Sequence, residues 1–205
     1  MKKIFLAISK GRIMDEALTL LKENKIECDA SPNESRKLIF KTNYENLEII
    51  IVRASDVPLY IESGKVDLGI VGKDTLLESN VDNYFFLKNL NIASCKLVVA
   101  GKQNKKLVSN MKIATKYPSL TQDFFLSKGI PCSILKLYGS MELAAVLNLS
   151  DAIVDLVDTG RTLRENGLEE ICLIENISSH LIVNKSSYKI KKKQIDKLVN
   201  RISSK

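Results

Sequence analysis

The chain has 205 residues, 45% of them hydrophobic and 27% charged, with a formal net charge of +7 at pH 7. This length can bury one large core or two small ones, and no apolar run is long enough to cross a membrane. The excess positive charge lies within residues 185–205, so the rest of the chain is neutral overall. A basic groove for nucleic acid is therefore not expected. The basic segment is interpreted as a solvated helix face, with a surface for an acidic partner as the alternative.

The cysteines and the single histidine favour a cytoplasmic protein without a metal centre built from these side chains. Cys28, Cys95, Cys132 and Cys172 are far apart in the sequence, and each lies among apolar residues. They are predicted to be reduced thiols of the core. His180 lies in a strand-like stretch and is predicted to be structural, because a lone histidine cannot form a zinc site of the histidine type.

The N-terminal segment combines a predicted strand, residues 3–8, with the polar turn Ser9-Lys10-Gly11-Arg12 and an amphipathic helix over residues 14–24. The apolar run after Lys3 is too short for a signal peptide. Lys10 and Arg12 then lie at the carboxyl end of a strand, where open α/β sheets bind ligands, and two cations suit a polyphosphate. The alternative is surface charge near a helix start, which is weaker because the helix N-terminus disfavours cations.

Two strands are predicted next, over residues 36–41 and 47–52, followed by a short helix that Ser55 or Asp56 caps and Gly64 ends. Residues 66–71 form another predicted strand, and residues 72–74 open another helix. Arg53 and Lys73 again lie at strand ends. Asp67 and Gly69 lie within or beside a strand, where a glycine permits close approach by a ligand or another backbone. Asp67 is equally well explained as a turn residue.

The strand and helix pattern restarts near residue 91. Strands are predicted over residues 95–100, 112–115 and 133–137, and helices over residues 118–128 and 140–148. Ser140 is expected to cap the second of these helices. Glu142 lies in its first turn, where the helix dipole favours a carboxylate. The functional alternative for Glu142 is a carboxylate that faces a sugar pocket.

Residues 150–168 are the most informative part of the chain. A buried strand over residues 152–157 leads into the turn Asp158-Thr159-Gly160 and a helix that Asn166-Gly167 stops. Free N–H groups and the dipole at such a helix start favour an anion, and two threonine hydroxyls, those of Thr159 and Thr162, add donors. Asp155 and Asp158 suit sugar hydroxyls or a hydrated metal ion. This pattern indicates a pocket for a phosphorylated sugar, and an ordinary capped strand–turn–helix is the alternative.

Residues 170–174 and 180–183 are predicted strands, and the basic C-terminal segment is a predicted amphipathic helix. The alternation of strands and helices predicts an α/β fold with largely parallel sheets. We expect two lobes that face each other across a cleft. The expected domains are residues 1–91 plus 178–205 and residues 92–177, the second of which carries the sugar-phosphate loop.

With these motifs in order, the chain resembles the catalytic subunit of ATP phosphoribosyltransferase, the first enzyme of histidine biosynthesis. The resemblance covers nearly the whole chain, and the order of the motifs makes it specific. It is carried by Ser9-Lys10-Gly11-Arg12, by Arg53, Asp56-Val57-Pro58, Tyr60 and Gly64, by Asp67-Leu68-Gly69-Ile70, Gly72, Asp74 and Glu78, by Ala114-Thr115-Lys116-Tyr117-Pro118, by Gly139-Ser140 with Glu142, and by Asp155-Leu156-Val157-Asp158-Thr159-Gly160-Arg161-Thr162-Leu163 with Asn166-Gly167-Leu168. One departure is that Ala144-Ala145 continues the helix where the family often has a proline.

The resemblance implies a fold similar to the type II periplasmic binding proteins, with the active site between the lobes. It implies a magnesium-dependent reaction that joins N1 of the ATP adenine to C1 of 5-phosphoribosyl 1-pyrophosphate and releases pyrophosphate. The implied catalytic residues are Asp155, Glu142 and Arg53. The resemblance assigns the sugar phosphate to Asp155, Asp158, Thr159, Gly160, Arg161 and Thr162, and assigns ATP to Lys10, Gly11, Arg12, Asp67, Leu68 and Gly69. The magnesium ligands stay open.

The chain resembles the short form of the family, which lacks a regulatory domain. Short forms work with a subunit similar to histidyl-tRNA synthetase, so the resemblance implies that partner in a hetero-octamer, without nucleic acid or membrane. Two alternatives remain at this point. One is a small-molecule-binding module of the same bilobed fold, and the other is a phosphoribosyltransferase that acts on another base.

Overall fold

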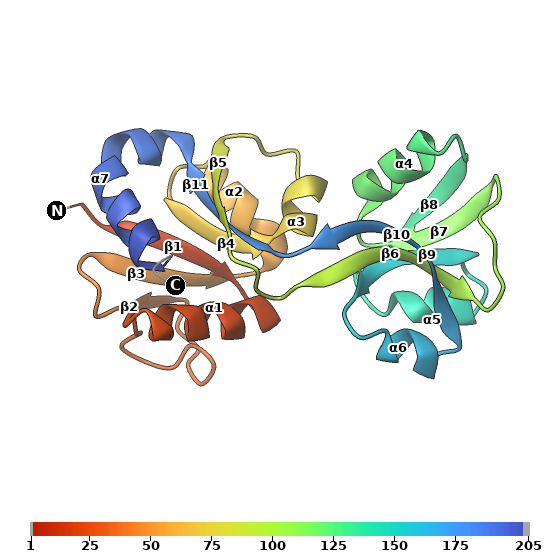
Figure 1. Cartoon of the computed structure of the whole chain (residues 1–205), viewed down its shortest axis with the longest axis horizontal. Coiled ribbons are helices and arrows are strands. Elements are labelled where there is room, and N and C mark those ends of the chain that lie inside the picture. Colours follow the sequence, from red (N-terminus) through yellow and green to blue (C-terminus); the bar gives the residue numbers. More distant parts are fainter. Residues whose placement is uncertain (1, 203–205) are drawn as a thin grey trace. The chain divides into compact units, whose positions relative to one another are not determined.

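The computed structural model describes residues 2–202, and the chain divides into two compact units (Figure 1). Unit 1 contains residues 1–93 and 178–205, and unit 2 contains Ser94–Ile177. The chain therefore enters unit 2 once and returns once. Among residues 2–202, no helix combines the length and the apolar character that a membrane crossing needs.

Unit 1 is built on a six-stranded sheet with the order β2-β3-β1-β4-β11-β5. The strands are β1 Ile4–Ser9, β2 Ile39–Lys41, β3 Leu47–Val52, β4 Leu68–Gly72, β5 Tyr84–Asn89 and β11 Ser179–Asn184. β1 pairs in parallel with β3 and with β4, whereas β2, β11 and β5 join the sheet through antiparallel pairs. The carboxyl ends of β1, β3 and β4 therefore meet at one edge of the sheet, which we call the unit 1 carboxyl edge.

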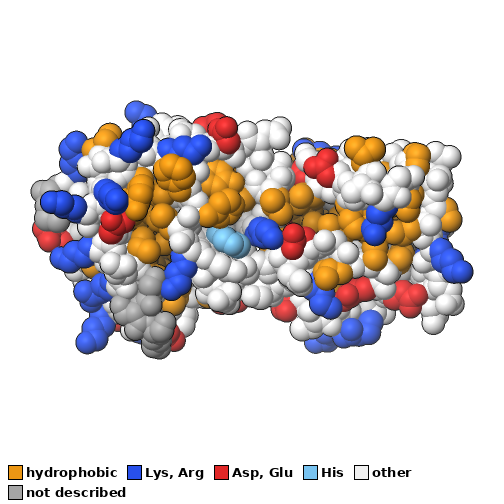
Figure 2. Space-filling view, turned by 45° about the horizontal axis from the view of Figure 1, so that its top comes forward, with side chains coloured by type: hydrophobic (Ala, Val, Ile, Leu, Met, Phe, Trp, Pro, Cys, Tyr) orange, Lys and Arg blue, Asp and Glu red, His pale blue; other side chains and the backbone are white. Residues whose placement is uncertain are grey.

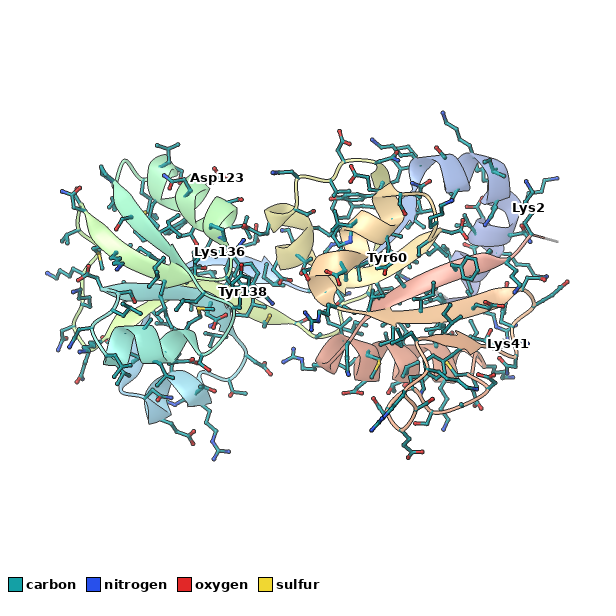
Figure 3. The ribbon with its side chains drawn as sticks, turned by 180° about the vertical axis from the view of Figure 1, so that it is seen from behind. Lys2, Lys41, Tyr60, Asp123, Lys136 and Tyr138 are labelled. Carbon is teal, nitrogen blue, oxygen red and sulfur yellow. The ribbon has the colours of Figure 1, made fainter. Side chains whose placement is uncertain are left out.

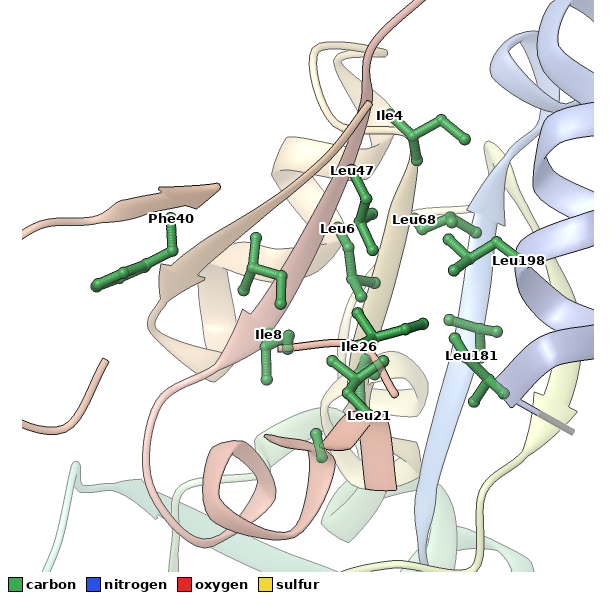
Figure 4. Packing of buried hydrophobic residues seen from close by; sticks show 14 of the residues in the cluster. Ile4, Leu6, Ile8, Leu21, Ile26, Phe40, Leu47, Leu68, Leu181 and Leu198 are labelled. Atoms are coloured by element: carbon green, nitrogen blue, oxygen red, sulfur yellow. The ribbon is translucent and has the colours of Figure 1, made fainter. Parts of the chain in front are cut away.

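Helices cover both faces of this sheet, because successive side chains of a strand point to opposite faces. The helices of unit 1 are α1 Arg12–Glu23, α2 Val57–Glu62, α3 Lys73–Glu78 and α7 Lys185–Ile202, with the 3-10 helix η1 at Ala54–Asp56. On one face Leu6 and Ile8 pack with Leu21 of α1 and Leu198 of α7 (Figure 4). On the other face Ala7 packs with residues of α2. The alternation in β1 thus fixes which helix covers which face.

Unit 2 is built on a five-stranded sheet with the order β10-β6-β9-β7-β8. The strands are β6 Cys95–Lys102, β7 Met111–Thr115, β8 Cys132–Lys136, β9 Ala152–Val157 and β10 Leu168–Ile177, and the helices are α4 Pro118–Ser127, α5 Met141–Val146 and α6 Arg161–Glu165. β7 pairs in parallel with β8 and β9, and β6 is antiparallel to β9 and β10. The carboxyl ends of β7, β8 and β9 therefore share the unit 2 carboxyl edge.

The expectation of largely parallel sheets is wrong, because both sheets are mixed. β2 and β3 are joined by a turn too short for the crossover that a parallel pair requires, and β6 and β11 run antiparallel to the neighbouring strands β9 and β4. The expected caps are also wrong in detail. Ser140 occupies the N-cap position of α5 with a left-handed φ of 51° but makes no capping hydrogen bond through its side chain. Asp56 precedes α2 and makes none either, and Ser55 lies inside η1.

The basic C-terminal segment is α7, and it packs its apolar side against the sheet. Ile195, Leu198 and Ile202 are buried, while most of its lysines are exposed, and Lys and Arg side chains are numerous on the corresponding end of unit 1 in Figure 2. Lys185 and Lys191 are only partly exposed, and Lys191 is the one that contacts a buried carboxylate. It lies at a kink in the helix, with φ −118° and ψ 18°, and its side chain is only 17% exposed. The described part of α7 is therefore a packed helix with a solvated basic face.

Candidate active site

The loop after β9 forms the centre of the candidate site in unit 2. β9 is buried between β6 and β7, and its apolar residues end at Val157, so the chain emerges at the unit 2 carboxyl edge. Asp158 and Thr159 are exposed, and Gly160 precedes α6 with φ 70°. A residue other than glycine rarely adopts this φ, so the turn geometry depends on Gly160.

The first turn of α6 presents polar groups to solvent. Helix geometry leaves its first N–H groups without acceptors inside the helix, and α6 has no side-chain cap at Gly160. The Arg161 N–H has a local acceptor, the Thr159 hydroxyl at 3.4 Å, which is a long contact. Thr162 is exposed beside it. The Arg161 side chain turns to Glu165, with Nε 2.7 Å from the carboxylate. The loop can therefore donate several hydrogen bonds to one anion.

Asp155 and Glu142 lie on the same face of the unit 2 sheet. Asp155 is two residues from Ile153 and from Val157, and these two pack with Met141 of α5, so the alternation along β9 turns Asp155 toward that face. The Asp155 Oδ1 accepts the N–H of Leu156 at 2.8 Å, and the side chain stays partly exposed. Glu142 is half-buried in the first turn of α5. Two carboxylates thus share the face and the edge that carry the α6 loop.

Basic side chains gather at the unit 1 carboxyl edge. Lys10 follows β1 and Arg53 follows β3, and these strands end in register, with Ser9 opposite Val52 and the Lys10 N–H donating to the Val52 carbonyl at 2.8 Å. Arg12 begins α1, and its Nε lies 3.3 Å from the Glu16 carboxylate.

Gly11, between Lys10 and Arg12, has φ 103°, and a Cβ there would meet open space, so the backbone conformation rather than crowding requires glycine. Lys73 begins α3 after β4, beside the same edge. The arrangement can hold an anion with several charges, because cations from three neighbouring strand ends reach one edge.

Asp67, Leu68 and Gly69 do not lie with these cations, and their role in ATP binding stays a prediction. They lie at the amino end of β4, and Leu68 pairs with Leu6, so they are away from the carboxyl edge. The Asp67 side chain is 3% exposed, and both of its carboxylate oxygens lie 2.8 Å from the Lys191 Nζ. The Leu68 side chain is fully buried.

Gly69 lies under α2, where a Cβ would come 2.9 Å from Val57 Cγ1. The structure therefore gives all three residues packing roles, because they precede or begin a strand instead of following it.

An exposed aromatic residue that sequence reasoning did not single out lies at the unit 2 carboxyl edge. Tyr138 follows β8 and is 81% exposed, and the Lys136 Nζ lies 5.8 Å from its ring centroid (Figure 3). The signal that could have found it is its position, directly after a strand and before the turn Gly139-Ser140. An exposed ring beside a phosphate loop can stack on a base or a sugar.

His180 and the cysteines lie outside the candidate site. His180 is half-buried in β11 and packs edge-on against Phe86, with 5.5 Å between ring centroids. All four cysteines are free and half-buried. Burial raises the pKa of the Cys28 thiol to about 11, and burial also raises the pKa of Cys132 and of Cys172. High thiol pKa values disfavour the thiolate, so Cys28, Cys132 and Cys172 are poor nucleophiles near neutral pH.

The two mixed sheets with helices on both faces define an α/β protein of the periplasmic-binding-protein type. The periplasmic aliphatic sulphonate binding protein SsuA from Escherichia coli is similar to the chain with a TM-score of 0.62, covering 100% of this chain and 72% of SsuA at 14% identity. At this identity the similarity concerns the fold alone.

The particular family is defined by sequence. The family model described as HisG: ATP phosphoribosyltransferase matches residues 53–204. An ATP phosphoribosyltransferase from Polaromonas naphthalenivorans is 48% identical over 206 residues, covering 98% of this chain and 95% of the relative. An ATP phosphoribosyl transferase (HisG:HisZ) complex from Thermotoga maritima is similar with a TM-score of 0.86 and 34% identity, covering 98% of this chain and 97% of that chain. The chain belongs to the ATP phosphoribosyltransferase family.

Proposed function

We propose that the protein transfers the 5-phosphoribosyl group of 5-phosphoribosyl 1-pyrophosphate to N1 of the ATP adenine and releases pyrophosphate, which is the first step of histidine biosynthesis. The observation that carries the proposal is the strand-end loop at residues 158–162, in a chain that belongs to this family. The loop accounts for the binding of one substrate, through the 5-phosphate of 5-phosphoribosyl 1-pyrophosphate. The unit 1 carboxyl edge accounts for a second, more highly charged anion.

In this proposal the 5-phosphate binds to the loop. It accepts hydrogen bonds from the N–H groups of the first turn of α6 and from the hydroxyls of Thr159 and Thr162, both exposed side chains. Gly160 gives the turn its left-handed φ of 70°, which orients the N–H groups of the first turn of α6 toward the phosphate. Asp155 accepts hydrogen bonds from the ribose hydroxyls. Asp158, in the loop, is a second carboxylate that accepts hydrogen bonds from them. Arg161 contributes its backbone N–H, since its side chain pairs with Glu165.

The chemistry needs no nucleophile from the protein. The bond between C1 and the pyrophosphate oxygen breaks with its electron pair going to pyrophosphate, and the lone pair of adenine N1 forms the new bond to C1. Positive charge develops on the ribose ring as the bond lengthens. The carboxylates of Asp155 and Glu142 stabilise that charge, because fixed negative charges lower the energy of a cation in a site with little water. The protein's remaining task is to hold the reactants in line.

The polyphosphates are assigned to the unit 1 carboxyl edge. Lys10 and Arg12 bind phosphates of ATP, with Gly11 shaping the turn between them. Arg53 faces the pyrophosphate leaving group and stabilises the charge that develops on it. The support for this assignment is the convergence of Lys10 and Arg53 at two paired strand ends. Asp67, Leu68 and Gly69 stay predicted ATP contacts, and their burial at the amino end of β4 argues against that role.

Magnesium belongs to the proposal as a substrate-bound ion. Among residues 2–202, no three His, Cys, Asp or Glu side chains converge as a metal cluster. Mg²⁺ commonly binds through one or two carboxylates together with substrate phosphates, and the pair Asp155 and Glu142 fits that donor set. When bound with pyrophosphate, the ion neutralises negative charge on the leaving group. Asp155 and Glu142 would hold it through their carboxylate oxygens.

We also propose a regulatory partner similar to histidyl-tRNA synthetase, in a hetero-octamer. The support is the similarity to the Thermotoga maritima chain, which was solved in an ATP phosphoribosyl transferase (HisG:HisZ) complex. The free, half-buried cysteines are compatible with the reducing conditions of the cytoplasm, where we place the protein.

The test is pyrophosphate release and product formation from ATP, 5-phosphoribosyl 1-pyrophosphate and Mg²⁺, with the chain alone and with the synthetase-like subunit from the same genome. We expect turnover with ATP that strengthens when the subunit is added, and none with free adenine, guanine or uracil. Turnover with a free base in place of ATP would identify another phosphoribosyltransferase. Binding of both substrates without turnover, with the subunit present, would favour a binding module.

A further inference from the structure

A carboxylate of α1 joins the unit 1 carboxyl edge to residues 90–94, the segment between β5 and β6, which we call the linker. Glu16 is one turn beyond Arg12, and its Oε1 lies 3.3 Å from the Arg12 Nε. Its other oxygen, Oε2, accepts the N–H of Ala93 at 2.7 Å. Ala93 is the last residue of unit 1 before unit 2, and Figure 1 shows the start of α1 beside this segment. One carboxylate therefore contacts both the linker and a residue assigned to the phosphates of ATP.

The linker has an unusual backbone conformation at the point that Glu16 contacts. Ala93 has a φ of 49°, a left-handed conformation that alanine rarely adopts, and the residue is only 9% exposed. A strained residue of this kind persists only where its surroundings fix it. The Ser179 N–H donates to the Ile92 carbonyl at 3.0 Å, which holds the linker on one side. The hydrogen bond from the Ala93 N–H to Glu16 holds it on the side of α1.

The stability of α1 does not explain the pair formed by Arg12 and Glu16. Arg12 is the first residue of α1, where the helix dipole disfavours a cation, and an arginine four residues before a glutamate is the weaker order of such a pair. A half-exposed pair usually contributes little, because two long side chains must be ordered to form it. Here the hydrogen bond to Ala93 already orders the Glu16 side chain. Glu16 can therefore hold Arg12 at a lower cost in entropy than a freely rotating glutamate could.

We propose that Glu16 is a positioning residue: anchored on the Ala93 N–H, it holds the Arg12 guanidinium in place for the phosphates of ATP. This inference rests on the assignment of those phosphates to Arg12 in the proposed function. A guanidinium carries five N–H donors, so a contact through Nε is compatible with a phosphate on the side of the two Nη atoms. ATP binding and the linker conformation are then coupled, because a ligand that orders Arg12 also orders Glu16 and the Ala93 hydrogen bond.

The competing explanation is that Glu16 serves only to accept the Ala93 N–H. The substitution Glu16→Gln separates the two roles. The side-chain oxygen of glutamine still accepts the Ala93 N–H, so the linker contact is retained. The charge is lost, and the glutamine NH₂ group offers donors where the Arg12 guanidinium requires an acceptor. A purely structural role is therefore preserved in Glu16→Gln, whereas the positioning of Arg12 is not.

The experiment combines two measurements on the full-length chain. Calorimetric titration gives the affinities for ATP and for 5-phosphoribosyl 1-pyrophosphate without requiring turnover, and NMR follows the hydrogen exchange of the Ala93 amide. Glu16→Gln should bind ATP about fivefold more weakly and 5-phosphoribosyl 1-pyrophosphate as tightly as the unaltered protein. Without ligand, the Ala93 amide should exchange at the same rate in both proteins. ATP should slow this exchange several-fold in the unaltered protein but not in Glu16→Gln.

The matched control is Glu23→Gln, the same change at the exposed last residue of α1, which should leave both ATP binding and its effect on Ala93 unchanged. Arg12→Met distinguishes the two ways of failing. If Arg12→Met binds ATP normally, the assignment of ATP to Arg12 is wrong and the inference fails with it. If Arg12→Met weakens ATP binding but Glu16→Gln binds ATP as tightly as Glu23→Gln, only the inference fails. Equal slowing of Ala93 exchange by ATP in Glu16→Gln and in the unaltered protein would also overturn it.

Discussion

Lys191→Met tests the structural role of the buried pair formed by Lys191 and Asp67. The Asp67 side chain is 3% exposed, and the Lys191 Nζ contacts both of its oxygens at 2.8 Å and the Lys3 carbonyl at 2.6 Å. Methionine keeps the length and apolar stem of lysine but removes the charge. Asp67 is then left buried with one remaining donor, the Phe5 N–H at 2.9 Å.

The expected loss of unfolding free energy is about 3 kcal/mol, the lower end of the range for breaking a buried ion pair, because Lys191 is 17% exposed and Asp67 keeps one hydrogen bond. For a unit of this size the loss corresponds to roughly 10 °C in Tm. Urea unfolding followed by circular dichroism measures it. Lys193→Met is the control, since Lys193 is an exposed lysine of the same helix, and it should cost less than about 0.5 kcal/mol.

The same pair decides between packing and ATP binding for Asp67. Because Asp67 lies at the amino end of β4, Asp67→Asn should leave the KM for ATP unchanged while it lowers stability. The reasoning would be refuted by a Lys191→Met protein as stable as Lys193→Met. It would also be refuted by an Asp67→Asn protein of normal stability with a strongly raised KM for ATP.

Two further substitutions and one reactivity measurement test the packing and the titration of single residues. Gly69→Ala should lower the unfolding free energy by about 1–3 kcal/mol in a urea titration, because its Cβ would lie 2.9 Å from a side chain of α2. The Lys112 N–H and the Lys105 ammonium hold the pKa of Asp151 below its ordinary value, so its stabilising contribution is present above the unfolded pKa and is lost as the pH falls. Stability measured between about pH 4 and pH 2 should therefore fall less steeply in Asp151→Asn than in the unaltered protein. Cys28, whose pKa is about 11, should react with a thiol reagent at pH 8 roughly two orders of magnitude more slowly than a free thiol, and mass spectrometry showing equal rates would contradict its burial.

The pattern of apolar residues predicted most elements, but it could not predict how the strands pair. β1 and β9 were predicted to within a residue or two, because each is a short apolar run that ends at a polar turn. β5 was missed, because it is an edge strand with exposed aromatic residues, Phe85 and Phe86, which give no alternating pattern. The sequence did contain one usable signal for the mixed sheets. The short turn between the strands predicted over residues 36–41 and 47–52 leaves no room for a crossover, and these strands, β2 and β3, pair antiparallel.

Position relative to a strand explains which predicted site residues the structure brings together. Lys10 and Arg53 follow parallel strands, and the carboxyl ends of such strands share one edge. Asp67 precedes its strand, so the same rule places it at the other edge. Its partner Lys191 is 124 residues away and lies at a kink of α7, and no local pattern could predict that contact. Tyr138 was overlooked because exposure cannot be read from an isolated aromatic residue.

The central claim is that the α6 loop holds the phosphate of the sugar substrate, and Gly160→Ala tests it most directly against Gly129→Ala. Both glycines belong to unit 2 and have similar left-handed φ angles, 70° and 67°, so both changes carry a backbone strain of about 1–2 kcal/mol. Gly160→Ala also requires the Arg164 side chain to move, because the added Cβ would lie 2.9 Å from Arg164 Nη1, whereas a Cβ at Gly129 would meet open space. Calorimetric titration with 5-phosphoribosyl 1-pyrophosphate should show affinity at least tenfold weaker in Gly160→Ala and unchanged in Gly129→Ala. Equal affinity in the two variants would contradict the claim.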